Sequence, residues 1–548
     1  MKLNNVDYQI MWARLVAVVE EQATTLIRTA FSTSVREAGD LSAGVFDRQG
    51  RMIAQAVTGT PGHVNAMAES VTHFINEIGQ DNIKEGDVYL TNDPWKGTGH
   101  LHDFTMVSPS FYQGKHIGFF AATAHVVDIG GRGFGPDANE VYEEGLLIPI
   151  MKFVVEGEVN KGLVNIIRNN VREQDQVIGD LYSLAACNAT GDDRLMSMMA
   201  EFSLTELDDL SDFIIDSSRA ATLARIADLP DGTYHNAMSV DGYEKQVDMK
   251  VALTIKDDTL LADFDGTSGL SKFGVNVPMV YTRAYACYGL KCAIAPDIPN
   301  NTGSLLPFSV TAPEGCILNA PHPAPVSVRH VIGHLIPDVV LGALHHCIPG
   351  VSPAEGSSAL WNVLISARPV DPASGLPPAE ILMFNSGGMG ARATLDGLSA
   401  TAFPSGVSTM SSEATEHVGP LTVWRKELRG GSGGSGEFRG GLGQTIEISA
   451  TQGYELYFNA MFDRIKFPAR GLNGGGSGGA GCASLDDGTV LKGKGRQKVP
   501  TGVKLILQLP GGGGYGDPKK RNRDAVKADL AAGYITEKQA IEDYGLAI

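Results

Sequence analysis

Glycine is the residue that most constrains how this chain can fold. It provides 66 of the 548 residues, about 12%, where roughly 7% is usual. The glycines gather in patches at residues 430–443, 471–481 and 511–516. Because glycine loses more backbone freedom on folding than other residues, such patches favour turns and irregular backbone over long helices. Strand-like runs separate the patches, so residues 358–515 are predicted to be strands and glycine loops.

The rest of the composition is that of a globular protein. Hydrophobic residues make up 43% of the chain, charged residues 19%, and the formal net charge is -18. The sequence contains no cluster of Lys and Arg residues that could bind a phosphate backbone, which argues against a nucleic-acid partner. The six cysteines include no Cys-x-x-Cys pair and are expected to be reduced. With no leader-like start and no apolar stretch of about 18 residues, we expect a cytoplasmic protein that does not cross a membrane.

The spacing of apolar residues predicts an α+β fold in a large, multi-lobed chain. Expected helices lie at residues 6–30, 64–79, 171–226, 277–295, 329–348 and 522–548. Expected strands lie at residues 41–55, 87–91, 104–109, 117–128 and 233–265. Four regions follow from this pattern: a metal-binding region with an N-terminal helix and a mixed sheet (1–232), a mixed α/β region with central helices (233–357), a glycine-rich β region (358–517) and a helical tail (518–548).

Residues 92–128 carry the strongest chemical signal. They read NDPWKGTGHLHDFTMV and then AATAHVVDIGG, which places His100 three residues before Asp103 and 25 residues before His125. Two imidazoles and a carboxylate are the ligands of catalytic Mn, Fe or Zn sites that keep positions open. His102 and Asp128 are candidates for partners that orient these imidazoles. The alternative is that the histidines are hydrogen-bonded core residues and the aspartates turn residues.

Three other features are ambiguous. Asp40 lies where a helix gives way to a strand, so it could be a further ligand or general base, or only a turn or cap residue. His63 precedes a helix, and the sequence favours a cap over a substrate contact. The motif PGGGGYGDP offers many backbone N–H groups to an anion, but it lacks the Lys-Ser/Thr of a P-loop, so structural turns are favoured.

These motifs resemble those of the hydantoinase B/oxoprolinase family. The similarity runs along essentially the whole chain, from VREAGDLSAGVFD through GDVYLTNDPWKGTGHLHD, AHVVDIGG, NNVREQDQVIGDL and IPNNTGSLLPF to SGGMGARATLDG, GLNGGGSGG and PGGGGYGDP. The family comprises metal-binding subunits of hydantoinases, lactam hydrolases, 5-oxoprolinases and related ketone carboxylases. One departure is His102, at a position that often holds Pro in the family.

The resemblance implies a site and a partner. The family's metal ligands correspond to His100, Asp103 and His125, with Asp40 at or beside the metal as a ligand or base. ATP and Mg would be bound by a separate hydantoinase A-type subunit, which phosphorylates the carbonyl oxygen of a cyclic amide such as a hydantoin, 5-oxoproline or a lactam. The expected assembly is therefore a hetero-oligomer. Two alternatives stay open: a subunit of an ATP-dependent ketone carboxylase, and a non-catalytic scaffold for the partner.

Overall fold

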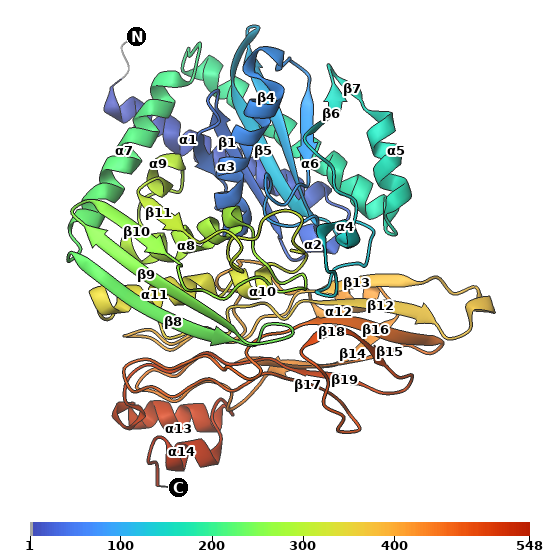
Figure 1. Ribbon diagram of the computed structural model, residues 1–548, viewed down its shortest axis with the longest axis vertical. Helices are drawn as coiled ribbons and strands as arrows, with labels where there is room; N and C mark the ends of the chain where they lie inside the picture. The colour runs from blue at the N-terminus through green and yellow to red at the C-terminus, as the bar shows by residue number, and fades with distance from the viewer. Residues whose placement is uncertain (1–3, 58, 548) are drawn as a thin grey trace.

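The computed structural model describes residues 4–57 and 59–547. Its N-terminal region is built on a seven-stranded sheet in the order β2-β1-β5-β4-β3-β6-β7 (Figure 1). The strands are β1 (Leu41–Asp47), β2 (Met52–Gln55), β3 (Val88–Thr91), β4 (Asp103–Tyr112), β5 (Lys115–His125), β6 (Met151–Val155) and β7 (Glu158–Val159). Each pairing in this sheet is antiparallel, which corrects the expected mixed sheet. The α+β class is confirmed.

Helices cover both faces of this sheet. Helices α1 (Asn5–Thr29), α6 (Gln174–Glu201) and α7 (Asp208–Ala227) share one hydrophobic core with the sheet, and α3 (Pro61–Ile78) packs on the opposite face. Neighbouring residues of one strand therefore enter different cores: Phe120 lies in the first and Phe119 in the second. Burial on both faces explains why β5 has an almost continuous apolar sequence. The shorter helices of this region are α2 (Thr33–Arg36), α4 (Val141–Glu144) and α5 (Lys161–Asn170).

The central region combines a smaller sheet with helices. Strands β8 (Gly232–Val240), β9 (Val247–Lys256), β10 (Thr259–Asp263) and β11 (Phe308–Thr311) form a sheet in which β10 and β11 pair in parallel and the other neighbours antiparallel. The helices are α8 (Met279–Ile294), α9 (Thr302–Leu305), α10 (His330–Gly333) and α11 (Ile336–Cys347). Helix α8 packs against both α3 and α11, which joins this region to the N-terminal one. The helices and strands expected between residues 233 and 348 are thus confirmed.

The C-terminal region is a two-sheet sandwich followed by a tail (Figure 1). One sheet has the order β13-β12-β16-β18 and the other β14-β15-β19-β17, and their side chains share one core. The strands are β12 (Val363–Pro369), β13 (Ala379–Met383), β14 (Leu421–Leu428), β15 (Gln444–Ala450), β16 (Tyr454–Met461), β17 (Cys482–Leu485), β18 (Lys494–Val499) and β19 (Leu505–Gln508). Helix α12 (Ser412–His417) precedes β14, and the expected tail helices are α13 (Arg523–Ala531) and α14 (Glu537–Glu542).

The glycine patches pack backbone against backbone beside the sandwich. The N–H of Gly512 donates to the carbonyl of Gly441 (3.0 Å), and the Gly512 carbonyl accepts from Gly434 (2.9 Å). A Cβ added at Gly512 would lie 2.0 Å from the Met389 carbonyl oxygen, which no side chain can tolerate. The amides of residues 511–514 all donate to backbone carbonyls. Since these N–H groups are already bonded, the structural interpretation of PGGGGYGDP is confirmed.

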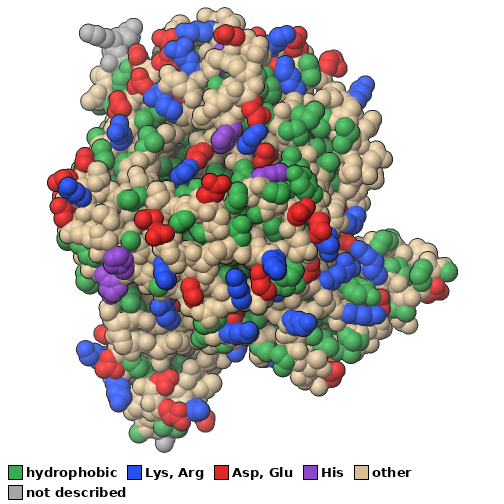
Figure 2. Space-filling view, in the orientation of Figure 1, with side chains coloured by type: hydrophobic (Ala, Val, Ile, Leu, Met, Phe, Trp, Pro, Cys, Tyr) green, Lys and Arg blue, Asp and Glu red, His purple; other side chains and the backbone are tan. Residues whose placement is uncertain are grey.

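On the face shown in Figure 2, acidic and basic side chains are interspersed. Among the helices of the described residues, none combines the length and apolar character needed to cross a bilayer. The four regional boundaries expected from the sequence stay a prediction.

Candidate metal centre

Strand register brings the three central candidates together. Asp103 is the first residue of β4 and His125 the last residue of β5, and they are directly paired across this antiparallel hairpin. His100 lies three residues earlier, in the turn that enters β4. All three side chains are almost completely buried. A hairpin therefore converts a separation of 22 residues into direct contact.

The ligand atoms converge as a metal site requires. Asp103 Oδ1 lies 2.7 Å from His100 Nε2 and 3.0 Å from His125 Nδ1. One ligand atom from each residue lies within 4.8 Å of the other two. Ligands about 2.1 Å from a common ion are separated by about 3 Å when they are adjacent. Two imidazoles and one carboxylate on one side of an ion leave its other coordination positions open.

Hydrogen bonds fix the orientation of the three ligands. His100 Nδ1 donates to the Ser327 carbonyl oxygen (2.7 Å), which leaves the lone pair on Nε2. The second carboxylate oxygen of Asp103 accepts from Thr98 Oγ1 (2.6 Å), His63 Nε2 (2.9 Å) and the guanidinium of Arg329. Oδ2 is thus occupied by three donors, while Oδ1 faces the two imidazoles.

The charge states also suit metal binding. Burial, reinforced by the positive charge of Arg329, lowers the pKa of His100 to about 3, so its imidazole is neutral at physiological pH. Burial alone would raise the pKa of Asp103, but His100, His63 and Arg329 hold it well below its usual value. A neutral imidazole and an ionised carboxylate are the forms that bind a cation.

Asp40 lies beside this cluster. Its carboxylate accepts from Thr60 Oγ1 (3.0 Å) and stands 3.6 Å from His63 Nδ1. His63 in turn donates to Asp103, so the two carboxylates are bridged by one imidazole. Asp40 is 7% exposed and faces the same cavity as His100 and His125. Its role as ligand or base stays a prediction.

His63 was assigned wrongly as a helix cap. Thr60 occupies the N-cap of α3, and the His63 side chain points between Asp40 and Asp103. Burial lowers the pKa of His63, but the two carboxylates outweigh it and raise the pKa above the usual value.

The other two expected partners behave differently from each other. His102 is completely buried, stacked 5.5 Å from His125, and neither of its ring nitrogens has a hydrogen-bond partner within residues 4–57 and 59–547. It contacts His100 and His125 through its ring alone, so the expectation that His102 orients an imidazole by a hydrogen bond was wrong. Asp128 instead accepts from Gly130 N (3.0 Å) and Arg172 Nη1 (2.8 Å). The expectation that Asp128 orients an imidazole was therefore wrong.

Sequence reasoning missed the residues contributed by α8 and α10. Arg329 donates to Thr98 and Asp103 and stacks on the Tyr281 ring at 4.0 Å. His330 and His334 line the same cavity, and burial lowers the pKa of both well below the usual value. The i, i+4 spacing of these histidines was the one available signal. This spacing predicts that the two histidines share a helix face, but it does not predict that this face lies near Asp103.

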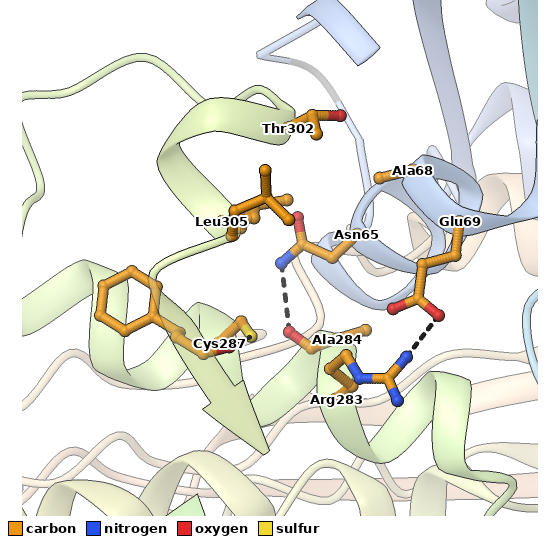
Figure 3. Close-up of a pocket in the computed structure, with 10 residues that line it drawn as sticks. Asn65, Ala68, Glu69, Arg283, Ala284, Cys287, Thr302 and Leu305 are labelled. Atoms are coloured by element: carbon orange, nitrogen blue, oxygen red, sulfur yellow. Dashed lines mark hydrogen bonds and ion pairs between the residues drawn. The ribbon is translucent and has the colours of Figure 1, made fainter. Parts of the chain in front are cut away.

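Two contacts away from the cluster join helices α3 and α8 (Figure 3). These helices carry His63 and Tyr281. Asn65 Nδ2 donates to the Ala284 carbonyl (3.1 Å), and Arg283 forms an ion pair with Glu69. These contacts line a separate pocket of about 150 Å³.

The cavity in front of the cluster is small and polar. Its volume of about 20 Å³ is enough for a single water. Among the described residues, five buried atoms at its lining residues have no hydrogen-bond partner: His63 Nδ1, His125 Nε2, His330 Nε2, His334 Nδ1 and Asn362 Oδ1. Unpartnered buried groups are costly unless a ligand satisfies them. The arrangement can therefore bind a cation on one side and hydrogen-bond a small polar group on the other.

Such a donor set, buried and with open positions, is typical of a metal-dependent enzyme. The family model of hydantoinase B/oxoprolinase matches residues 4–518, and the chain belongs to this family. It is 27% identical to the B-type component of a putative D-/L-hydantoinase from a Pseudomonas species (strain NS671), covering 100% of this chain and 96% of the relative.

Two solved structures share the fold. The ATP-dependent caprolactamase from Pseudomonas jessenii superposes with a TM-score of 0.90 at 24% identity, covering 100% of this chain and 97% of that one. An acetone carboxylase superposes with a TM-score of 0.86 at 19% identity, covering 98% and 79%. The chain is thus a member of the hydantoinase B/oxoprolinase family and has the fold of these two solved chains.

Proposed function

We propose that this chain is the metal-binding subunit of an ATP-dependent amidohydrolase that opens a cyclic amide. The observation that carries the proposal is the buried convergence of His100, Asp103 and His125 on one point beside Asp40. Hydantoins, 5-oxoproline and lactams are the candidate substrates, because the similar proteins are named for a hydantoinase and a caprolactamase. A hydantoinase A-type partner would bind ATP and Mg and phosphorylate the carbonyl oxygen.

The residues present fit a divalent cation such as Zn, Mn or Fe. The imidazoles of His100 and His125 and the ionised carboxylate of Asp103 would hold it. A bound divalent metal polarises a carbonyl oxygen and makes water more acidic. Phosphorylation by the partner weakens amide resonance, which makes the carbonyl carbon more open to attack.

The remaining residues transfer a proton and hold the Asp103 side chain in place. Asp40 would take a proton from the attacking water, because its carboxylate faces the cavity and is supported by Thr60 and His63. A new C–O bond forms, the ring C–N bond breaks, and the ring nitrogen takes up the proton that Asp40 accepted. The resulting acyl phosphate is then hydrolysed by a second water, which releases inorganic phosphate and the open-chain carboxylate. Arg329 keeps Asp103 ionised and fixed throughout.

The decisive experiment measures ADP release by this chain purified with its A-type partner. The substrates are hydantoin, N-methylhydantoin, 5-oxoproline, caprolactam and acetophenone, each with and without bicarbonate. ADP formed with a ring amide and without bicarbonate supports the amidohydrolase. ADP or AMP formed only with a ketone plus bicarbonate would refute it in favour of a carboxylase component, the candidate to which the shared fold of acetone carboxylase points.

The scaffold alternative is tested by metal content. His100→Ala and His125→Ala remove two of the three converging ligand atoms. Loss of both bound metal and turnover, with the complex still assembled, supports a catalytic role. Unchanged metal and turnover in both variants would leave only a scaffold.

A further inference from the structure

The antiparallel pairing of β1 and β5 changes at its last step, where β5 delivers His125 to the metal centre. Two residues that face each other as a hydrogen-bonded antiparallel pair normally exchange both N–H···O bonds. Leu41 pairs with Ala124, so this register sets Asp40 opposite His125. The His125 N–H donates to the Asp40 carbonyl (3.1 Å), but the Asp40 N–H donates to the Ser34 carbonyl (3.0 Å). The reciprocal bond from Asp40 to His125 is therefore not formed.

The side chain of Ser34 replaces that bond. Ser34 Oγ donates to the His125 carbonyl at 2.7 Å, and both residues are buried. The segment from Ser34 to Asp40 thus holds the His125 backbone on both sides, by a hydroxyl at its carbonyl and by a carbonyl at its N–H. Because this segment ends at Asp40, it also sets the position of the His125 imidazole relative to the Asp40 carboxylate.

The Ser34 hydroxyl is itself held in place. A hydroxyl has one hydrogen, and that of Ser34 goes to His125, so the hydroxyl of Ser32, 2.9 Å away, must donate to Ser34. Asp180 on α6 anchors the start of the turn, because its Oδ1 accepts from the N–H groups of Phe31 (2.8 Å) and Ser32 (3.1 Å). Ser32, Ser34 and Asp180 are at most 2% exposed. Bulk water therefore does not reach this turn, and loss of the Ser34 hydroxyl would remove a buried donor.

From these contacts we infer that Ser34 is a positioning residue of the metal centre, which sets the orientation of the His125 imidazole and its distance from Asp40. The inference rests on the proposed function, because it takes His125 as a metal ligand. Ser34 is not among the residues that line the cavity, so it acts through His125 and not on the substrate. Groups of a functional site must be held within about 0.5 Å of the productive geometry, and a ligand with one backbone anchor removed loses that precision.

The test is Ser34→Ala in the complex with the A-type partner. The variant should bind Zn²⁺ or Mn²⁺ about tenfold or more weakly than the wild type, measured by competition with a chelator. The visible absorption spectrum of the Co²⁺-loaded variant should differ from that of the wild type, because it reports the geometry of the ligands around the ion. With a ring amide as substrate, kcat should fall by about tenfold or more while KM changes by less than about threefold.

Two other buried serines separate the effect of this bond from the stability of the turn. Ser32→Ala leaves the bond from Ser34 to His125 in place and should lose less metal affinity than Ser34→Ala. Ser183→Ala is the matched control, because it removes a buried hydroxyl that donates to backbone carbonyls of α1 and α6. Its metal affinity should stay within about twofold of the wild type. Melting temperature and assembly with the partner are measured for every variant.

The outcomes distinguish the inference from the proposed function. A wild-type complex that binds no divalent metal would refute the proposed function and the inference with it. Unchanged affinity and Co²⁺ spectrum in Ser34→Ala, or an equal loss in Ser32→Ala, would overturn the inference alone. If Ser34→Ala does not fold, Ser34→Cys decides, because a thiol is of similar size but is a weaker donor. Lower affinity in Ser34→Cys then supports the inference, and affinity equal to that of the wild type overturns it.

Discussion

Glu144 offers a quantitative test of how the metal centre is supported. It lies at the end of α4, is 1% exposed, and its Oε1 accepts from the backbone N–H groups of Val326 (2.6 Å) and Ser327 (2.7 Å). The Ser327 carbonyl in turn accepts from His100. Among the described residues, Oε2 has no partner. Glu144 therefore holds the loop that orients one of the ligands.

Burial raises the pKa of Glu144 from 4.5 to about 8, although the two N–H groups oppose the shift. The folded protein thus binds this proton more tightly than the unfolded chain. Its contribution to stability is complete below about pH 4.5 and is lost as pH rises through about 8. At 1.36 kcal/mol per pKa unit the full loss is about 5 kcal/mol, of which roughly 3.5 kcal/mol falls between pH 5 and pH 8.

Glu144→Gln keeps the accepting oxygen and removes the titration. The free energy of unfolding of the variant relative to the wild type should therefore rise by about 3.5 kcal/mol from pH 5 to pH 8, which is measured by urea unfolding at several pH values. Other titrating groups cancel in this difference. A difference that stays constant over this range would refute the assignment of a buried, protonated Glu144.

Three further predictions concern the site and the glycine core. Asp40→Asn should abolish ring opening while the complex with the partner still assembles on size-exclusion chromatography; failure to assemble would make Asp40 structural. Arg329→Gln should weaken metal affinity by about 10- to 100-fold in a metal titration, because it removes a donor that holds Asp103; unchanged affinity would refute that role. Gly512→Ala should lower the free energy of unfolding by about 3 kcal/mol or more, since its Cβ would meet a carbonyl oxygen at 2.0 Å. Gly162→Ala is its control, as the nearest atom there is 3.4 Å away; equal losses would contradict the steric argument.

Much of the metal centre was predictable because it is local. Asp103 is the first residue of β4 and His125 the last residue of β5, and these strands follow each other in sequence. Consecutive apolar strands usually pair as a hairpin. Once they pair, register alone sets the two side chains beside each other, and His100 lies only three residues away. The helices and strands could be predicted from the sequence as well, because burial of one or two faces leaves a periodic pattern of apolar residues.

The residues that contact Asp103 from distant parts of the chain could not be predicted from the sequence in this way. Arg329 reaches Asp103 across 226 residues, and no periodicity relates the two positions. His63 has the sequence context of a helix start, and only the packing of α3 on the sheet shows its side chain between two carboxylates. The glycine patches likewise predicted loops but not their mutual packing, because hydrogen bonds between distant backbones leave no side-chain signature.

The sequence by itself therefore determined the family, the α+β class and the three converging candidate ligands, since each depends on motifs or on neighbours along the chain. The tertiary structure alone decided which groups hold those side chains in place and how small the cavity is. These properties arise from contacts between segments hundreds of residues apart. Their geometry is set by the packing of the whole core rather than by any local pattern.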